Sequence, residues 1–125
     1  IHDAARPLLS AGLIHDCLQG LVGYDGVLPV LPMKDTVYLS EDGKEISSLL
    51  DRKQIFAGQA PEAFRLGSYC RANQALMPDR ILTINGSTEV AVMAGMKVHM
   101  IPGNERNFKI TTAEDLQRFE RIVTA

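Results

Sequence analysis

Val27-Leu28-Pro29-Val30-Leu31 is an unbroken apolar run of strand length. The turn-forming pair Asp25-Gly26 precedes this run and ends the element before it. Ahead of that pair, apolar side chains between Leu13 and Leu21 recur at helical spacing, and Ser10 is placed to cap the helix. A helix followed by a strand is therefore the first unit that the sequence predicts.

Helices and strands continue to alternate after residue 61. The elements expected there are a helix from Pro61 to near Leu76, a short strand at Ile81–Ile84, a helix capped by Ser87 and stopped by Gly95, a strand at Val98–Ile101, and a helix opened by a capping box at Thr112–Asp115. This alternation predicts an α/β layer architecture with a mostly parallel sheet. Because Ile1-His2-Asp3 reads as the end of a strand, we expect upstream sequence to be missing.

Residues 32–61 interrupt the alternation. Thr36–Leu39 and Glu45–Leu50 flank the turn-like Glu41-Asp42-Gly43, which predicts a β-hairpin. Few core-filling residues surround this hairpin, and an isolated hairpin is only marginally stable in water. We therefore expect it to pack on something else, and a second subunit is one candidate.

Composition excludes several classes of partner. The 13 Lys and Arg against 15 Asp and Glu give a net charge of −2, so we expect no broad nucleic-acid binding, which needs a dense basic stripe. The apolar runs are far shorter than the ~20 residues that cross a bilayer, so we expect no membrane partner. Cys17 and Cys70 lack metal-binding spacing, and we expect both to be buried free thiols in a reducing cytoplasm.

Two clusters near the ends of the chain suit an anionic ligand. In His2-Asp3-Ala4-Ala5-Arg6-Pro7, Asp3 lies where a strand is expected to end, and Arg6 can meet a phosphate. In Asn107-Phe108-Lys109-Ile110, Lys109 is flanked by apolar residues just before a capped helix, so its amine can face a site. The alternatives are a structural Asp–Arg pair in a tight turn and a lysine that reaches solvent from a strand edge.

A third cluster lies on the hairpin. Lys34-Asp35-Thr36 stands across from Asp51-Arg52, and a threonine hydroxyl with an arginine fork suits a phosphate monoester. A solvated hairpin with cross-strand pairs is the alternative for these residues. His15 and His99 lack metal ligands at the required spacing, so we expect both to be structural or surface groups.

These motifs resemble those of the 2-C-methyl-D-erythritol 4-phosphate (MEP) cytidylyltransferase family, also called IspD, across nearly the whole chain. The matching segments are His2–Pro7, Pro32–Thr36, Asp51-Arg52, Gln59–Glu62 and Asn107–Leu116. The resemblance implies a Rossmann-like nucleotidyltransferase fold, of which residues 1–125 would be the C-terminal portion of a single domain. It also implies a homodimer in which the hairpin, residues 32–61, reaches the partner's site.

The implied reaction transfers CMP from CTP to MEP with release of pyrophosphate, in the non-mevalonate route to isoprenoid precursors. By resemblance, Asp3 and Arg6 bind the sugar-alcohol phosphate, and the Ala4 backbone lies near the CTP ribose. Thr36 and Arg52 reach the phosphate of the substrate in the neighbouring subunit. Lys109 contacts the CTP α-phosphate, and family members need Mg²⁺. Since the family's Gly-rich triphosphate loop is not in these residues, we expect the 125 residues alone to be inactive.

Four positions depart from the family's pattern near its substrate pocket. Ala60 replaces a threonine, Glu62 replaces a glutamine, and Asn85-Gly86 replaces a Thr-Asp pair. These differences leave ribitol 5-phosphate or another alditol phosphate open as the acceptor. A non-catalytic domain that binds a nucleotide or mediates dimerisation is the alternative of another class, and the retained Asp3, Arg6 and Lys109 argue against it.

Overall fold

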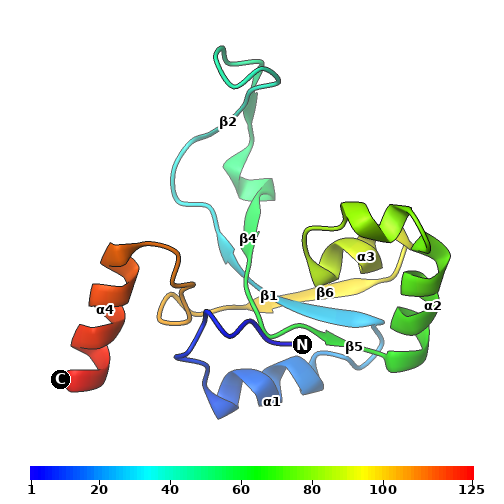
Figure 1. Ribbon diagram of the computed structural model, residues 1–125, viewed down its shortest axis with the longest axis horizontal. Coiled ribbons are helices and arrows are strands. Elements are labelled where there is room, and N and C mark those ends of the chain that lie inside the picture. Colours follow the sequence, from blue (N-terminus) through cyan, green and yellow to red (C-terminus); the bar gives the residue numbers. More distant parts are fainter.

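Strand β1 (Gly26–Pro32) is the centre of the main sheet in the computed structural model, which describes all residues from 1 to 125. Strand β6 (Val98–Pro102) pairs with it in parallel. Strands β4 (Phe56–Gly58) and β5 (Ala63–Phe64) pair antiparallel with its two ends (Figure 1). The α/β class is confirmed, but the sheet is mixed, so the expectation of a mostly parallel sheet is wrong.

The mixed sheet follows from the route by which the chain returns to β1. Antiparallel neighbours can be joined by a hairpin, whereas parallel neighbours need a longer crossover that is usually helical. Between β1 and β4 the chain runs out along a hairpin and back, with only the short 3₁₀ helix η1 (Arg52–Gln54) on the way. The connection from β1 to its parallel neighbour β6 is much longer and contains two α-helices.

One small apolar cluster joins the first helix to the sheet, and a second joins the next two helices to each other. The helices are α1 (Ala11–Gln19), α2 (Leu66–Leu76), α3 (Ser87–Met93) and α4 (Ala113–Thr124). Leu13 and Cys17, one turn apart on α1, pack against Val27 and Ile101 of the sheet. A second cluster joins α2 to Val90 of α3. Only 15 of the 125 residues are buried, so the core is small. None of the helices is long and apolar enough to cross a membrane.

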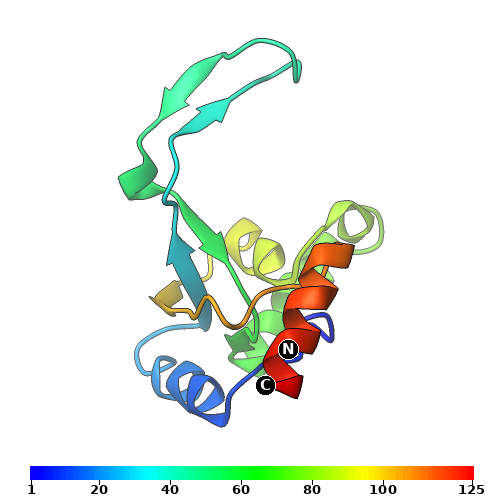
Figure 2. The same cartoon turned by 90° about the vertical axis from the view of Figure 1, so that its left-hand side faces the viewer.

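A narrow arm, residues 33–55, extends away from the sheet (Figures 1 and 2). It carries the two-stranded hairpin of β2 (Val37–Leu39) and β3 (Ser48–Leu50), in which Tyr38 is paired with Leu49. The hairpin that the sequence predicts is therefore present. The C-terminal part of the predicted hairpin region, residues 32–61, belongs to the main sheet, because Phe56–Gly58 forms β4 beside β1.

Local signals located the helix ends well. The Leu13 amide donates to Ser10 Oγ at 3.1 Å, which caps α1. Thr112 and Asp115 form a reciprocal capping box at the start of α4. Gly95 follows α3 with a φ of 72°, a left-handed conformation that suits glycine. These three assignments from the sequence are confirmed. The expected cap at Ser87 is wrong, because Ser87 is the first residue of α3, the N-cap position is Gly86, and no side chain caps this helix.

Other assignments from the sequence are wrong. The expected strand at Ile81–Ile84 is the 3₁₀ helix η2 (Arg80–Thr83), which the bond from the Leu82 amide to the Asp79 carbonyl (3.1 Å) helps to close. Helix α2 begins late because the two residues of β5 pair with β1 instead. Ile1–Asp3 forms no strand. Cys17 is buried as expected, but Cys70 is exposed on α2, and both are free thiols.

Candidate active site

A cavity of about 400 Å³ lies between the first turn of the chain, the segment after β4, the loop before α3 and Lys109. Its lining residues are Ile1, His2, Asp3, Arg6, Gln59, Ala60, Glu62, Asn85, Gly86, Ser87 and Lys109. A larger cavity of about 510 Å³ beside α1 is mainly apolar and has no Lys or Arg in its lining. Of these two cavities, the smaller one therefore combines cations with polar groups that can bind a phosphorylated ligand.

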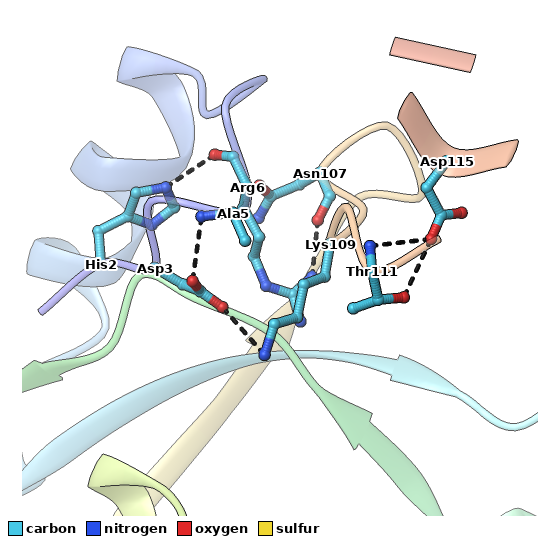
Figure 3. Close-up of polar contacts among 8 residues, drawn as sticks. All are labelled: His2, Asp3, Ala5, Arg6, Asn107, Lys109, Thr111 and Asp115. Carbon is cyan, nitrogen blue, oxygen red and sulfur yellow. Dashed lines mark hydrogen bonds and ion pairs between the residues drawn. The ribbon is translucent and has the colours of Figure 1, made fainter. Parts of the chain in front are cut away.

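The turn at the start of the chain fixes the Asp3 carboxylate. The Ala5 amide donates to Asp3 Oδ1 at 3.1 Å, and the Arg6 amide donates to the Asp3 carbonyl at 2.9 Å. His2 Nε2 lies 2.9 Å from the Arg6 carbonyl oxygen and braces the same turn (Figure 3). Ala4 is exposed in this turn. One carboxylate oxygen is thus held by the backbone, and Oδ2 remains for another partner.

Lys109 supplies that partner. Its Nζ lies 3.4 Å from Asp3 Oδ2, with the side chains of Lys109 and Asp3 50% and 35% exposed (Figure 3). The hydrogen bond from the Ala5 amide lowers the pKa of Asp3 from its ordinary value, and the Lys109 charge lowers this pKa further. Burial has the opposite effect, which is smaller than that of the Ala5 hydrogen bond. The structure therefore brings Asp3, Arg6 and Lys109 to one cavity, with the Asp3 carboxyl ionised at neutral pH.

The backbone around Lys109 is anchored to the same turn. The Arg6 guanidinium donates through Nη1 to the Asn107 carbonyl at 2.8 Å, and the Ile110 amide donates to the Ala5 carbonyl at 2.8 Å. Arg6 is therefore committed in part to the chain itself, although it also lines the cavity. The two bonds hold the segments on either side of Lys109.

Sequence reasoning missed the buried amides of Gln59 and Asn107. The Asn107 side chain donates through Nδ2 to the Ala60 carbonyl at 2.6 Å, and Gln59 Nε2 lies 3.4 Å from the Asn107 carbonyl oxygen. Both residues stand inside motifs that the family resemblance marks, but amide side chains in polar surroundings give no pattern that distinguishes a buried amide from an exposed one. Their burial depends on packing between distant segments.

The positions that depart from the family's pattern all line this cavity. Ala60, Glu62, Asn85 and Gly86 belong to its wall. Glu62 is fixed there because the Thr88 hydroxyl donates to its Oε2 at 2.8 Å. A carboxylate accepts hydrogen bonds only, so Glu62 can bind ligand hydroxyls and repels a phosphate.

The remaining two candidate residues meet on the arm. Thr36 and Arg52 line a hollow of about 480 Å³ together with Leu49, Leu50 and Asp51. Arg52 Nη1 donates to the Lys34 carbonyl at 2.6 Å, which steadies the guanidinium. The hollow shares no lining residue with the cavity at Asp3, and the arm extends away from the sheet (Figure 2). Within one chain the structure therefore does not bring Thr36 and Arg52 to Asp3 and Lys109.

The chain has no group of three or more His, Cys, Asp and Glu side chains that could hold a metal ion. His99 stacks on Tyr24, with ring centroids 4.3 Å apart, and is a structural group as expected. The carboxylates in the cavity are those of Asp3 and Glu62. Mg²⁺ is commonly held by one or two carboxylates together with substrate phosphates. These residues fit an ion that arrives on a phosphate ligand and do not fit one held by the protein alone.

Comparison with known proteins identifies one family over the whole chain. Residues 1–125 match the family described as IspD: 2-C-methyl-D-erythritol 4-phosphate cytidylyltransferase. The chain is 35% identical to the 2-C-methyl-D-erythritol 4-phosphate cytidylyltransferase of Rubrobacter xylanophilus, over all of this chain and 54% of that protein. It is 36% identical to the bifunctional enzyme IspD/IspF of Paramagnetospirillum magneticum, over 94% of this chain and 30% of that protein.

Solved structures agree with the sequence matches. The crystal structure of 2-C-methyl-D-erythritol 4-phosphate cytidylyltransferase from Thermus thermophilus superposes with a TM-score of 0.81 at 26% identity, covering 99% of this chain and 60% of that one. A synthase from Anaerococcus prevotii gives a TM-score of 0.85 at 23% identity and supports the fold. The chain spans about half the length of the single-function relative and a smaller share of the bifunctional one.

Proposed function

Because the chain belongs to the 2-C-methyl-D-erythritol 4-phosphate cytidylyltransferase (IspD) family, we propose that it carries part of the active site of an enzyme that transfers CMP from CTP to MEP. The observation that supports this most directly is the cavity in which Lys109 lies 3.4 Å from Asp3 and beside Arg6. A cation opposite a fixed carboxylate, in a cavity of polar groups, suits a phosphate ester with free hydroxyls.

The proposed reaction is attack by a phosphate-monoester oxygen of the acceptor on the α-phosphorus of CTP. The new P–O bond forms as the bond from the α-phosphorus to the bridging oxygen breaks, and pyrophosphate leaves with that electron pair. The attacking oxygen is already ionised near neutral pH, so no general base is required. The barrier arises from repulsion between two anions and from charge that builds at phosphorus, which cations around the α-phosphate reduce.

The cavity residues divide naturally between the two substrates. We assign Lys109 to the α-phosphate, where its ammonium would exchange Asp3 for the phosphate as charge develops. Asp3 and Arg6 would bind the acceptor, through its hydroxyls and its phosphate respectively. The exposed Ala4 backbone would border the CTP ribose. These roles require one change in the contacts that the structure shows: Lys109 would leave Asp3 and bind the α-phosphate.

We propose that Thr36 and Arg52 complete the site of a second subunit. The arm extends away from the sheet, and its hairpin exposes large apolar side chains, with Tyr38 53% and Leu49 66% exposed. A hairpin with so little cover gains stability by packing on another chain. A twofold dimer would place each arm's hollow over the partner's cavity, and the guanidinium of Arg52 would then bind the acceptor's phosphate.

Mg²⁺ enters this proposal as a companion of the nucleotide. When bound, it would neutralise phosphate charge and hold the triphosphate in one geometry. Asp3 is the residue that we assign to it, since its Oδ2 has only the exchangeable Lys109 contact. The free thiols of Cys17 and Cys70 agree with a reducing compartment, and we propose the cytoplasm.

A second acceptor is supported by a specific observation. Ala60, Glu62, Asn85 and Gly86, which depart from the family's pattern, all line the cavity. Glu62 offers an acceptor-only group held by Thr88, which suits an additional hydroxyl better than a methyl group. An alditol phosphate such as ribitol 5-phosphate is therefore the alternative substrate.

The test is pyrophosphate release by the intact protein with CTP and Mg²⁺, comparing MEP with ribitol 5-phosphate. Higher kcat/KM with MEP supports the proposed function, and higher kcat/KM with ribitol 5-phosphate moves the enzyme to the alternative acceptor. CTP binding in calorimetry without turnover of either acceptor would instead favour a non-catalytic nucleotide-binding domain. That residues 1–125 alone are inactive stays a prediction, which the same assay can check.

A further inference from the structure

We propose that Gln59 and Asn107 are positioning residues that hold the backbone on which Lys109 is presented to the cavity. This inference rests on the proposed function for its kinetic part and on geometry alone for the rest. Gln59 is 7% exposed and Asn107 2% exposed, and they are the polar side chains among the buried residues of the chain. Such groups are costly to bury, so their hydrogen bonds indicate what they do.

Gln59 secures the loop that precedes Lys109. Its Nε2 donates to the Asn104 carbonyl at 3.0 Å, and its Oε1 accepts from the Asn104 amide at 3.1 Å. The same Nε2 lies 3.4 Å from the Asn107 carbonyl oxygen. The amide therefore makes both a donor and an acceptor contact with one loop, which an ionised carboxylate cannot do because it has no donor.

Asn107 joins that loop to two other segments. Its Nδ2 donates to the Ala60 carbonyl at 2.6 Å, and its backbone carbonyl accepts from Arg6 Nη1 at 2.8 Å. Beyond Lys109, the Ile110 amide donates to the Ala5 carbonyl at 2.8 Å. Lys109 thus has an anchor on each side, one to the segment after β4 and one to the N-terminal turn, as Figure 3 shows for Arg6 and Asn107.

The ion pair with Asp3 does not explain the position of Lys109. Both side chains are substantially exposed, and exposed pairs contribute little to holding a geometry. The amides are the stronger constraint because the Gln59 and Asn107 side chains are themselves buried, and their bonds to the Asn107 and Ala60 carbonyls are buried as well. A displacement of about 1 Å at a reacting centre can lower a rate by about a hundredfold. Gln59 and Asn107 should therefore affect kcat without contacting either substrate.

The kinetic test is Gln59→Glu in the intact protein, with CTP, Mg²⁺ and the better acceptor. The ionised carboxylate has no donor for the Asn104 and Asn107 carbonyls, whereas the protonated acid has one, and burial favours the protonated form. We expect kcat about tenfold to a hundredfold below wild type, with both KM values little changed. The ratio of variant to wild-type kcat should rise as the pH is lowered.

Asn73→Asp is the matched control, because Asn73 also donates an amide hydrogen bond, to the Tyr69 carbonyl at 2.8 Å within α2, and does not line the cavity. We expect it to leave kcat and its pH profile unchanged. An unaltered kcat in Gln59→Glu, a change confined to KM, or a kcat ratio that is independent of pH would each overturn the proposal.

A second measurement does not depend on activity. If Gln59 and Asn107 hold the backbone around Lys109, weakening them should let that backbone open more often. The Ile110 amide, which donates to the Ala5 carbonyl at 2.8 Å, reports such opening. We expect NMR-detected hydrogen exchange at the Ile110 amide to be faster in Gln59→Met, or in Asn107→Ala if Gln59→Met fails to fold, and unchanged in Asn73→Ala. An unchanged exchange rate at Ile110 in the folded variant contradicts the positioning role. Absence of turnover in the wild type would reject the proposed function and leave this exchange measurement decisive.

Discussion

Lys109 Nζ lies 3.4 Å from Asp3 Oδ2, so the turn at the start of the chain is paired with the segment that leads into α4. The pair is substantially exposed, with half of the Lys109 side chain open to solvent. Breaking such a pair costs little, because exposed ion pairs typically contribute less than about 1 kcal/mol. Lys109 can therefore leave Asp3 for a phosphate without a large energetic penalty, and this exchange underlies the first prediction.

We expect Lys109→Ala in the intact protein to lower kcat by about a hundredfold or more, the scale of one lost electrostatic contact in the transition state. KM for the acceptor should change little, because the charge acts where negative charge develops. The free energy of unfolding should change by no more than about 1 kcal/mol. Steady-state kinetics and denaturant unfolding check these two expectations.

Lys97→Ala is the control for that experiment. Lys97 Nζ lies 5.0 Å from the centre of the Tyr24 ring and is not among the lining residues of the cavity. Its removal takes away the same charge and should leave kcat unchanged. A raised KM with unchanged kcat in Lys109→Ala would show that the lysine binds substrate without acting on the transition state.

The second prediction concerns acid stability. The pKa of Asp3 is lowered from 3.8, first by the Ala5 amide and then by Lys109, so the folded protein favours the ionised carboxyl. A lowered folded-state pKa stabilises the fold above the unfolded value, and this stability is lost as the pH falls through the folded value. The difference in unfolding free energy between wild type and Asp3→Asn should therefore shrink as the pH falls below 3.8.

Denaturant unfolding at a series of acidic pH values measures this difference. Asp16→Asn is the control, since the Asp16 side chain makes no hydrogen bond or ion pair. If the difference in unfolding free energy between wild type and Asp3→Asn stayed constant with pH, folding would not favour the ionised form of Asp3, and the prediction would be wrong.

Elements with local causes could be predicted from the sequence. Ser10 caps α1, and Thr112 with Asp115 opens α4, because a side chain three residues away satisfies a backbone amide that the helix leaves free. The hairpin of β2 and β3 has the turn residues and alternation that define such elements. The same sequence reading named Asp3, Arg6 and Lys109, and the structure brings them to one cavity, although the strand that was expected to end at Asp3 is absent.

Features that depend on distant pairing could not be predicted. Ala63 and Phe64 join the sheet because the chain returns along β1, and nothing in their own sequence distinguishes them from the start of α2. The burial of Gln59 and Asn107 likewise depends on three segments meeting. Whether Thr36 and Arg52 reach Asp3 depends on a second chain, so neither the sequence nor one chain determines it.

The third prediction concerns Gly103, where two backbones come together. A Cβ at this position would collide with Gln59 Oε1 and lie 3.1 Å from the Val30 carbonyl oxygen. Gly103→Ala should lower the free energy of unfolding by about 1–3 kcal/mol through overpacking. At Gly67, inside α2, an added Cβ would lie near only one atom, Arg71 Nη1 at 3.4 Å. Gly67→Ala should therefore raise the free energy of unfolding by about 0.5–1 kcal/mol. Chemical denaturation would contradict this account if the two substitutions had the same sign.

The fourth prediction tests the arm. If Arg52 acts in the partner's cavity, Arg52→Ala and Lys109→Ala dimers each lack a complete site. A mixed dimer has one complete site, formed by Lys109 of one subunit and Arg52 of the other. Co-refolding equal amounts should therefore restore about a quarter of wild-type turnover, because half of the dimers are mixed and each holds one of two sites. Mixing Lys109→Ala with Asp3→Ala is the control and should restore nothing, since both changes lie in one cavity. Equal recovery in the two mixtures would rule out a site shared between subunits.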